Sequence, residues 1–241
     1  MSAIEVDDAG EGSDTAEGAS AVPATRAHRQ VRFEVPAGAS EIVLVRHGET
    51  IAWDPETPFP LLDGHGDPEL GPEGIEQAAR VAERLASGQV DAIYVTSLRR
   101  TAETAAPLAA RLGLEPIVEA RLREVNLGEW EGGLYRLKVL TADPVAMEMI
   151  TRERWDVVPG AETNEAFAAR AAAAITDIAA GHPGERVVVF SHGGTIGTIL
   201  SVASGSRPFA FLGSDNGAIS TIVVSGDKWH VRGFNDVSHL G

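Results

Sequence analysis

Two short apolar segments, residues 41–46 and 186–191, constrain the fold of this chain more than any other feature. Each is predicted to form a buried β-strand, and each is followed at once by a histidine and a glycine, at His47 and at His192. Apolar runs of this length, bounded by glycine turns, are typical of strands that are covered on both faces. They favour an α/β domain with a mostly parallel sheet between two layers of helices, a three-layer α/β/α sandwich.

The segments between and after these strands fit such an alternation. An irregular stretch at 49–71, rich in proline, glycine and aspartate, is too long for an ordinary connection and is interpreted as a functional loop. The helix that follows starts at Pro72, and we expect it to bury one face made of Ile75, Ala78, Ala79, Ala82 and Leu85. Further strands are predicted at 91–96, 115–119, 218–225 and 229–235, and further helices at 98–112, 142–153, 163–180 and 195–204.

Composition divides the chain and excludes several functions. The first 20 residues contain six acidic side chains and no lysine or arginine, so residues 1–40 are predicted to be a disordered acidic tail and 41–241 the folded domain. A net charge of −15 argues against binding to nucleic acid or to an anionic membrane. The chain has no cysteine, no apolar run long enough to span a membrane and no signal peptide, so we expect a cytoplasmic protein.

The strand ends carry the residues suited to chemistry. In an open α/β sheet, ligands bind beyond the carboxyl ends of the strands, which is where His47 and His192 are expected. Arg46 precedes His47, and Arg99 and Arg100 follow the strand predicted at 91–96. Arginine binds phosphate through a planar fork of donors, so these positions indicate a local anion site within an acidic protein. The helix after the second histidine offers backbone N–H groups and a positive dipole end to the same anion.

Four motifs together resemble the histidine phosphatase superfamily, also called phosphoglycerate-mutase-like. Residues 44–50 (LVRHGET) resemble its nucleophile motif, and 96–105 (TSLRRTAETA) resemble its second arginine motif. Residues 122–132 (LREVNLGEWEG) resemble its acid-bearing loop, and 191–194 (SHGG) resemble its second histidine motif. The order of the four motifs and their spread over residues 41–240 make the resemblance specific.

This resemblance implies a role for each matched residue. His47 is the nucleophile that becomes phosphohistidine, and Glu124 protonates the leaving oxygen and then assists water. Arg46, Arg100 and His192 surround the phosphoryl group, and Thr50 and the backbone of Gly193 add hydrogen bonds to it. No metal or cofactor is implied. The expected activity is that of a histidine acid-type phosphatase, a phosphoric monoester hydrolase, acting on a small-molecule phosphate ester.

Two alternative functions remain open from the sequence. A phosphoglycerate mutase shares the same motifs, although the acid loop resembles phosphatase members more closely. A divalent-metal hydrolase would use Asp63, His65 and Asp67, which alternate oxygen and nitrogen ligands in the long loop. Trp130 and Trp155 are assigned either to a substrate pocket or to the core. The sequence identifies neither the substrate nor the oligomeric state, and a homodimer is left open.

Overall fold

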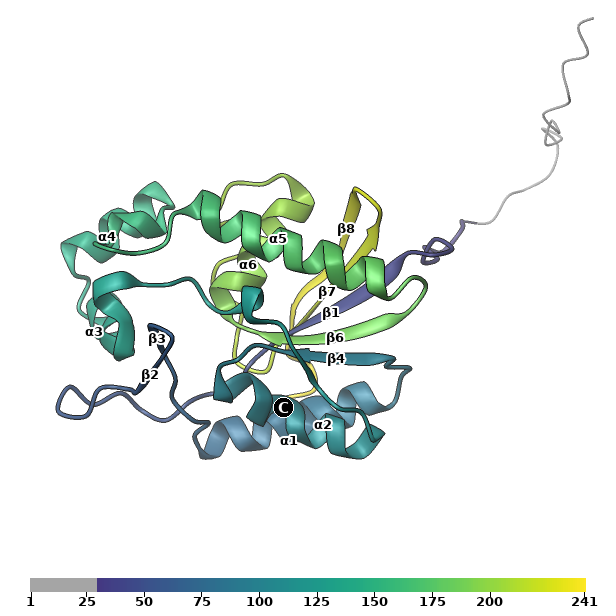
Figure 1. Ribbon diagram of the computed structural model, residues 1–241, viewed down its shortest axis with the longest axis horizontal. Coiled ribbons are helices and arrows are strands. Elements are labelled where there is room, and N and C mark those ends of the chain that lie inside the picture. Colours follow the sequence, from purple (N-terminus) through teal and green to yellow (C-terminus); the bar gives the residue numbers. More distant parts are fainter. Residues whose placement is uncertain (1–29) are drawn as a thin grey trace, which may run out of the picture. The chain divides into compact units, whose positions relative to one another are not determined.

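A six-stranded sheet with the strand order β5-β4-β6-β1-β7-β8 forms the centre of the fold (Figure 1). The structure is a computed structural model that describes residues 30–241. Strands β5, β4, β6 and β1 are parallel to one another, and β7 is antiparallel to both β1 and β8. The strands are β1 Ser40–Arg46, β4 Ala92–Val95, β5 Ile117–Val118, β6 Arg186–Ser191, β7 Ile219–Ser225 and β8 Lys228–Asp236.

Helices cover both faces of this sheet. Helices α1 (Pro72–Ala86) and α2 (Arg99–Leu112) pack on one face, against side chains of β1, β4 and β6 that form one apolar cluster. Helices α5 (Asn164–Gly181) and α6 (Gly193–Ser204) pack on the opposite face, where the alternate side chains of β1 and β6 form a second cluster. Because successive side chains of a strand point to opposite faces, one apolar run supplies both clusters. The predicted three-layer α/β/α sandwich is confirmed.

The structure corrects the predicted buried face of α1. Ile75 is 61% exposed, and Ala79 is exposed as well, whereas Gly74 and Val81 are buried. The helix is rotated toward Gly74 because this residue packs directly on the loop that follows β1. A Cβ atom on Gly74 would lie only 2.0 Å from the carbonyl oxygen of Glu49, so the absence of a side chain sets the orientation of the helix.

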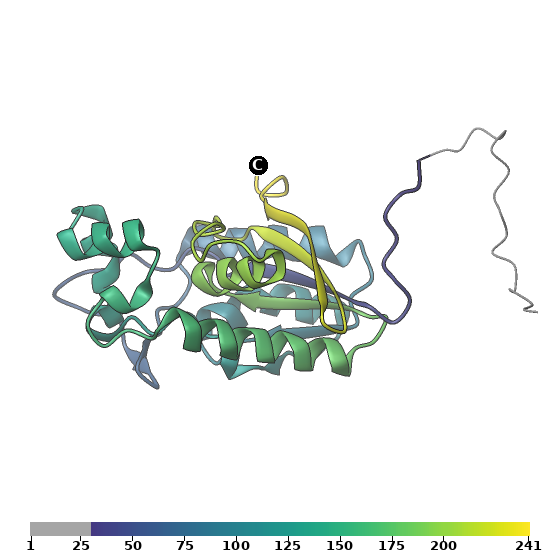
Figure 2. The same cartoon turned by 90° about the horizontal axis from the view of Figure 1, so that it is seen from above.

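A group of short elements lies beyond the carboxyl ends of the strands (Figure 2). It contains α3 (Leu134–Leu140), which was not predicted, and α4 (Pro144–Arg152), which corresponds to the helix expected at 142–153. A third apolar cluster, which includes Trp130, Met149 and Trp155, holds these helices in place. The remaining short elements are β2 Leu61–Leu62, β3 His65–Gly66, η1 Ala120–Leu122, η2 Gly128–Gly133 and η3 Trp155–Val157.

Most of the predicted acidic tail, residues 1–29, lies outside the described residues. Residues 30–39 form no helix or strand, and β1 begins at Ser40, one residue inside the predicted tail. Ser40 pairs with Val224 of β7, and its hydroxyl contacts the carbonyl oxygens of Ala179 at 2.9 Å and His182 at 2.7 Å, so the start of β1 is tied to the end of α5. Within residues 30–241, no helix is long and apolar enough to cross a membrane.

Candidate active site

The pairing of β1 with β6 brings the two predicted histidines together. In the parallel register Arg46 lies opposite Ser191, so His47 and His192 follow at neighbouring strand ends. The backbone N–H of His47 donates to the carbonyl oxygen of Ser191 at 3.0 Å, and the centroids of the two imidazole rings are 5.2 Å apart. Two residues that are 145 positions apart in the chain therefore share one site because their strands are hydrogen-bonded neighbours.

The local backbone fixes the protonation of His47. Its Nδ1 lies 2.7 Å from the carbonyl oxygen of Gly48, which can only accept, so Nδ1 carries the hydrogen and Nε2 holds the lone pair. Burial lowers the pKa of His47 well below its ordinary value, and the charges of Arg100 and Arg46 lower it further. The ring is therefore neutral near neutral pH, as a nitrogen nucleophile requires.

His192 is completely buried beside His47 and does not itself line the cavity. Its Nε2 lies 3.1 Å from the hydroxyl of Thr96, whereas its Nδ1 is buried without a partner in the described part of the chain. Burial, followed by the charge of Arg100, lowers the pKa of His192 well below its ordinary value. A buried polar atom without a partner is rare in a folded protein and commonly marks a functional position.

Arg100 is buried and Arg46 is half-buried at the predicted anion site. Arg46 donates through Nη1 to the carbonyl oxygen of Ser214, and its Nε is buried without a partner within residues 30–241. Arg100 donates through Nη1 to the carbonyl oxygen of Gly66 at 2.8 Å. Burial lowers the pKa of Arg46 and lowers the pKa of Arg100 to about 10. Both side chains are thus held in place by neutral acceptors while the remaining N–H groups stay available.

Glu124 lies against the first turn of α6. Its Oε2 accepts a hydrogen bond of 2.9 Å from the N–H of Gly194, and its Oε1 accepts from the N–H of Val125 at 3.0 Å. A Cβ atom on Gly194 would lie 2.5 Å from Oε1, so a glycine is needed there for the carboxyl to approach. From the sequence, the N-terminus of this helix is expected to bind the substrate anion. In the structure the backbone N–H of Gly194 instead donates to the carboxylate of Glu124.

Two positioning groups were not anticipated from the sequence. Arg170, on α5, donates to the carbonyl oxygens of Arg121, Arg123 and Glu124 over 2.7–2.8 Å, and so holds the backbone of the acid loop. Asn216 donates through Nδ2 to the carbonyl oxygen of His47 at 2.9 Å. Neither residue lies in a recognisable motif, and only the packing of distant segments brings them to the site.

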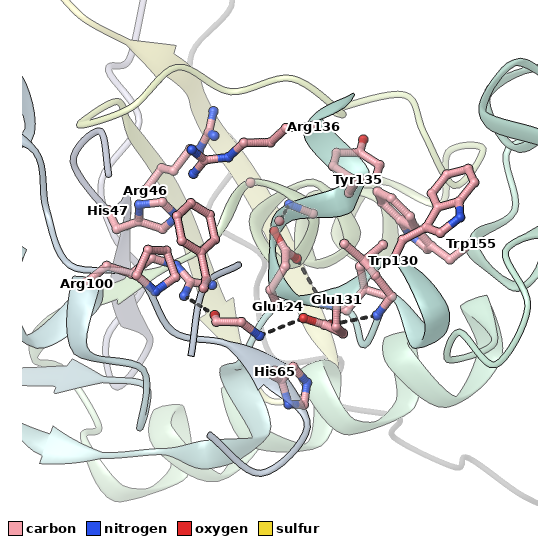
Figure 3. A pocket seen from close by; sticks show the side chains of 18 of the residues that line it. Arg46, His47, His65, Arg100, Glu124, Trp130, Glu131, Tyr135, Arg136 and Trp155 are labelled. Carbon is pink, nitrogen blue, oxygen red and sulfur yellow. Dashed lines mark hydrogen bonds between the residues drawn. The ribbon is translucent and has the colours of Figure 1, made fainter. Parts of the chain in front are cut away.

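A cavity of about 310 Å³ opens over these groups (Figure 3). Its lining includes both candidate arginines, His47 and Glu124, together with an aromatic wall of Phe59, Trp130, Tyr135 and Trp155. Burial, followed by the charge of Glu124, raises the pKa of Tyr135 to about 12. Trp130 and Trp155 are 5% exposed and belong to the third apolar cluster as well, so they serve both the core and the pocket.

Two predicted phosphate ligands, Gly193 and Thr50, differ in their position relative to the cavity. Gly193 lines the cavity, and a Cβ atom on it would lie 3.3 Å from Nε of Arg46. Thr50 is buried outside the cavity lining, and its hydroxyl accepts a hydrogen bond from Nη2 of Arg136. Thr50 therefore holds Arg136, a cavity residue that the sequence did not reveal, and its direct contact with the anion stays a prediction.

The proposed metal ligands of the long loop do not come together. Asp63 forms an ion pair of 2.8 Å with Arg123, and Asp67 accepts from the backbone N–H of Arg99 at 2.8 Å, while His65 lines the cavity. Within residues 30–241, no group of three His, Asp or Glu side chains is arranged to hold a metal ion. Asp63 and Asp67 instead attach the long loop to Arg123 and to the first residue of α2.

Comparisons with known proteins agree with this geometry. The family model of the histidine phosphatase superfamily (branch 1) matches residues 42–237. Phosphoglycerate mutase-like protein 4 of Arabidopsis thaliana is 38% identical over 83% of this chain and 87% of its own length. Metal-independent phosphoserine phosphatase of the same plant is 32% identical over 86% of both chains.

Solved structures show the same relationship. A mycobacterial glucosyl-3-phosphoglycerate phosphatase has a TM-score of 0.67 and 28% identity, with 82% of this chain and 99% of that chain covered. YhfR of Bacillus stearothermophilus has a TM-score of 0.70 and 28% identity, with 84% and 100% covered. The resemblance seen in the four motifs is confirmed, and the chain belongs to the histidine phosphatase superfamily, branch 1.

Proposed function

We propose that this protein hydrolyses small phosphate monoesters without a metal, through a phosphohistidine formed at His47. Membership of the histidine phosphatase superfamily and the similarity to a metal-independent phosphoserine phosphatase support a phosphatase. The observation that carries the assignment is the hydrogen bond from Nδ1 of His47 to the carbonyl of Gly48. It leaves the Nε2 lone pair of a buried, neutral histidine beside Arg46 and Arg100, which form no ion pair within the described residues.

In the first half-reaction Nε2 of His47 attacks phosphorus, and the bond from phosphorus to the ester oxygen breaks. Glu124 gives its proton to that oxygen, so the product leaves as an alcohol. Arg46 and Arg100 stabilise the charge on the equatorial oxygens, which is the main requirement of phosphoryl transfer. When Thr96 donates to Nε2 of His192, the unpartnered Nδ1 of His192 carries a hydrogen. Because His192 is buried beside His47 and does not line the cavity, this hydrogen reaches the phosphoryl group only when that group lies against His47.

In the second half-reaction a water molecule attacks the phosphohistidine. Glu124, now a carboxylate, takes the proton of that water, and inorganic phosphate leaves while the lone pair returns to His47. The finer classification as an acid-type phosphatase is supported by the depressed pKa of His47. The lowered pKa keeps the nucleophile neutral at pH values below the ordinary pKa of histidine. We propose a cytoplasmic location on the grounds of composition.

The first test is hydrolysis of p-nitrophenyl phosphate with EDTA present, comparing the wild type with His47→Ala. We expect EDTA-resistant turnover by the wild type, a stoichiometric acid-labile phosphoenzyme and loss of both in the variant. Circular dichroism and thermal unfolding of the variant control for its folding. Turnover that disappears in EDTA, or a folded His47→Ala variant with near-normal activity, would refute the proposal.

The role of Glu124 requires a separate test, because a carboxylate that only positions water would also matter. General acid catalysis contributes about 10²- to 10⁴-fold and counts most when the leaving group is basic. We therefore expect Glu124→Gln to lower the first-step rate far more for an alkyl phosphate than for p-nitrophenyl phosphate. Equal losses on both substrates would remove the acid role from Glu124.

A phosphoglycerate mutase is the second candidate, favoured by the 38% identity to phosphoglycerate mutase-like protein 4. A mutase returns the phosphoryl group from histidine to an organic hydroxyl, whereas a phosphatase returns it to water. Nuclear magnetic resonance of a 3-phosphoglycerate incubation, with and without 2,3-bisphosphoglycerate, separates the two. Isomerisation faster than phosphate release would establish the mutase.

A further inference from the structure

The arginines of the cavity differ from the arginines around it in how they are held. Arg99 forms ion pairs with Glu69 and Glu103, and Arg123 forms one with Asp63. Within the described residues, the three arginines that line the cavity, Arg46, Arg100 and Arg136, form no ion pair, and each is fixed by neutral oxygens. Charge that is held in place but not neutralised is suited to binding an anion.

Arg136 is the third of these arginines, and it reaches the cavity from α3. It donates through Nη1 to the carbonyl oxygen of Ile51 at 2.9 Å and through Nη2 to the hydroxyl of Thr50, and its guanidinium carbon lies 4.9 Å from the ring centroid of Phe59. Three neighbouring groups therefore orient the guanidinium. Its remaining N–H groups lie on the same side of the cavity as Arg46, opposite His65 (Figure 3).

The positive charge of Arg136 influences the nucleophile, but it is not needed to balance the negative charge of the phosphate. Burial, followed by the charge of Arg46, lowers the pKa of Arg136, and the charge of Arg136 contributes to the lowered pKa of His47. A phosphate monoester is a dianion near neutral pH, and Arg46 and Arg100 already match its two charges. The positive charge of Arg136 remains to be matched by the rest of the substrate.

We propose that Arg136 is a specificity-determining residue that binds a carboxylate of the substrate, so that the preferred substrates are short phosphate esters that also carry a carboxylate. This inference rests on the proposed phosphatase function and narrows its substrate class. The guanidinium fork matches a carboxylate with two parallel hydrogen bonds. One guanidinium balances one carboxylate, whereas a second phosphate would bring two charges to it. A cavity of about 310 Å³ suits a substrate of this size.

The test uses pairs of substrates that differ in the carboxylate alone. O-phosphoserine is compared with O-phosphoethanolamine, and 3-phosphoglycerate with glycerol 3-phosphate, with p-nitrophenyl phosphate as a common reference. We expect the wild type to prefer the carboxylate member of at least one pair by about 30-fold or more in kcat/KM, the discrimination that a site with buried or fixed polar groups provides. In Arg136→Met we expect this preference to fall to within about 3-fold, and kcat/KM to fall at least about 10-fold more for the carboxylate esters than for p-nitrophenyl phosphate, because only the carboxylate esters lose a charged contact.

Two further variants make the interpretation specific. Arg152→Met removes one positive charge from α4, where Arg152 pairs with Glu148 outside the cavity, and should leave both ratios unchanged. Thr50→Val keeps the shape of a buried side chain but removes the acceptor for Arg136, and should reduce the preference in part. Its effect distinguishes oriented binding by Arg136 from a general effect of positive charge.

The outcomes separate this inference from the proposed function. Without wild-type turnover on any of these esters, the phosphatase proposal itself fails. With turnover but no preference for either carboxylate ester, the inference about Arg136 fails and the phosphatase stands. Equal losses in Arg136→Met on p-nitrophenyl phosphate and on the carboxylate esters would assign Arg136 to the phosphoryl group instead, and would overturn the inference as well.

Discussion

Nδ1 of His47 donates to the carbonyl oxygen of Gly48 across 2.7 Å, so the residue that follows the nucleophile selects its reactive tautomer. The contact is made within one dipeptide and needs no partner from elsewhere in the chain. The glycine itself is required by packing, because a Cβ atom at position 48 would lie 2.5 Å from the carbonyl oxygen of Gly74 on α1. One turn therefore sets both the chemistry of the histidine and the approach of the first helix.

The two buried histidines predict that the domain loses stability in acid. The folded-state pKa values of His47 and His192 are well below their ordinary value, whereas in the unfolded chain each histidine binds a proton at about pH 6.5. Their contribution is complete above about pH 6.5 and is lost as the pH falls below it, at up to about 1.4 kcal/mol per pH unit for each histidine. Urea unfolding between about pH 7.5 and 5.5, in buffers without phosphate or sulfate, measures this slope.

Substitution of single histidines shows which residue causes this dependence of the unfolding free energy on pH. We expect His192→Gln to reduce the dependence of the unfolding free energy on pH by up to about 1.4 kcal/mol per unit below pH 6.5. His230→Gln, on the exposed side of β8, is the matched control and should leave the dependence unchanged. The same slope in wild type and His192→Gln would show that His192 is protonated in the folded protein.

Gly194 offers a way to move the candidate acid without changing a charge. In Gly194→Ala the new Cβ would lie 2.5 Å from Oε1 of Glu124, so the carboxyl must shift while alanine still suits the helix. We expect kcat for an alkyl phosphate to fall by about 10²-fold, within the usual contribution of a general acid, with little change in thermal stability.

The control for this glycine is Gly205, the C-cap of α6, which has a φ of 65° and nothing within 4 Å of an added Cβ. Gly205→Ala should destabilise the protein by about 1 kcal/mol, because an L-residue is strained in the left-handed region, and should leave kcat unchanged. Steady-state kinetics and thermal unfolding of both variants test whether Gly194→Ala lowers kcat with little change in stability and Gly205→Ala lowers stability with unchanged kcat. A fully active Gly194→Ala enzyme would contradict the placement of Glu124.

Arg170 is expected to affect catalysis through the acid loop alone. Arg170→Met removes the donors to three carbonyl oxygens of that loop and the paired contacts with Glu162 at 2.7 and 2.8 Å. We expect kcat to fall by about 10- to 100-fold with KM within about 3-fold, since a small displacement of a catalytic group is costly. The loss should be larger for alkyl phosphates than for p-nitrophenyl phosphate, as only the acid is disturbed. A uniform loss on both, or a raised KM alone, would contradict a positioning role.

Asn235 on β8 is expected to position the nucleophile through an intermediate turn. It accepts from the N–H of Asp215 at 2.7 Å and donates to the Asp215 carboxylate at 2.8 Å, and the next residue, Asn216, holds the carbonyl of His47. Its φ of 57° is a conformation that asparagine tolerates better than alanine does. Asn235→Ala should lower stability by about 1–2 kcal/mol and kcat by about 10-fold, through lost hydrogen bonds and backbone strain.

Asn235→Gly separates the two causes, because glycine adopts the same φ without strain but lacks the side chain. We expect stability to recover in part while kcat stays low. Thermal unfolding and kcat on p-nitrophenyl phosphate are measured on the same preparations. If kcat recovers together with stability, Asn235 supports the fold and does not position His47.

The sequence by itself determined the sheet and the residues at its functional edge. Apolar periodicity and glycine turns are local signals, so they located β1 and β6 and placed His47 and His192 at strand ends. The motif order identified Arg46, Arg100 and Glu124, which the structure brings around one cavity. Local patterns were weaker for elements held by few residues: β5 is only two residues long, and α3 has no buried side chain to reveal its period.

Only the tertiary structure decided what surrounds these residues. Arg136, Arg170 and Asn216 reach the site across 86, 46 and 169 residues of chain from the groups that they contact, and no pattern within a segment encodes such proximity. The partner of a side chain likewise depends on packing, which brought the hydroxyl of Thr50 to Nη2 of Arg136. The physical reason is that local sequence fixes backbone preference and burial, whereas the neighbours of a polar group are chosen by the way whole elements pack.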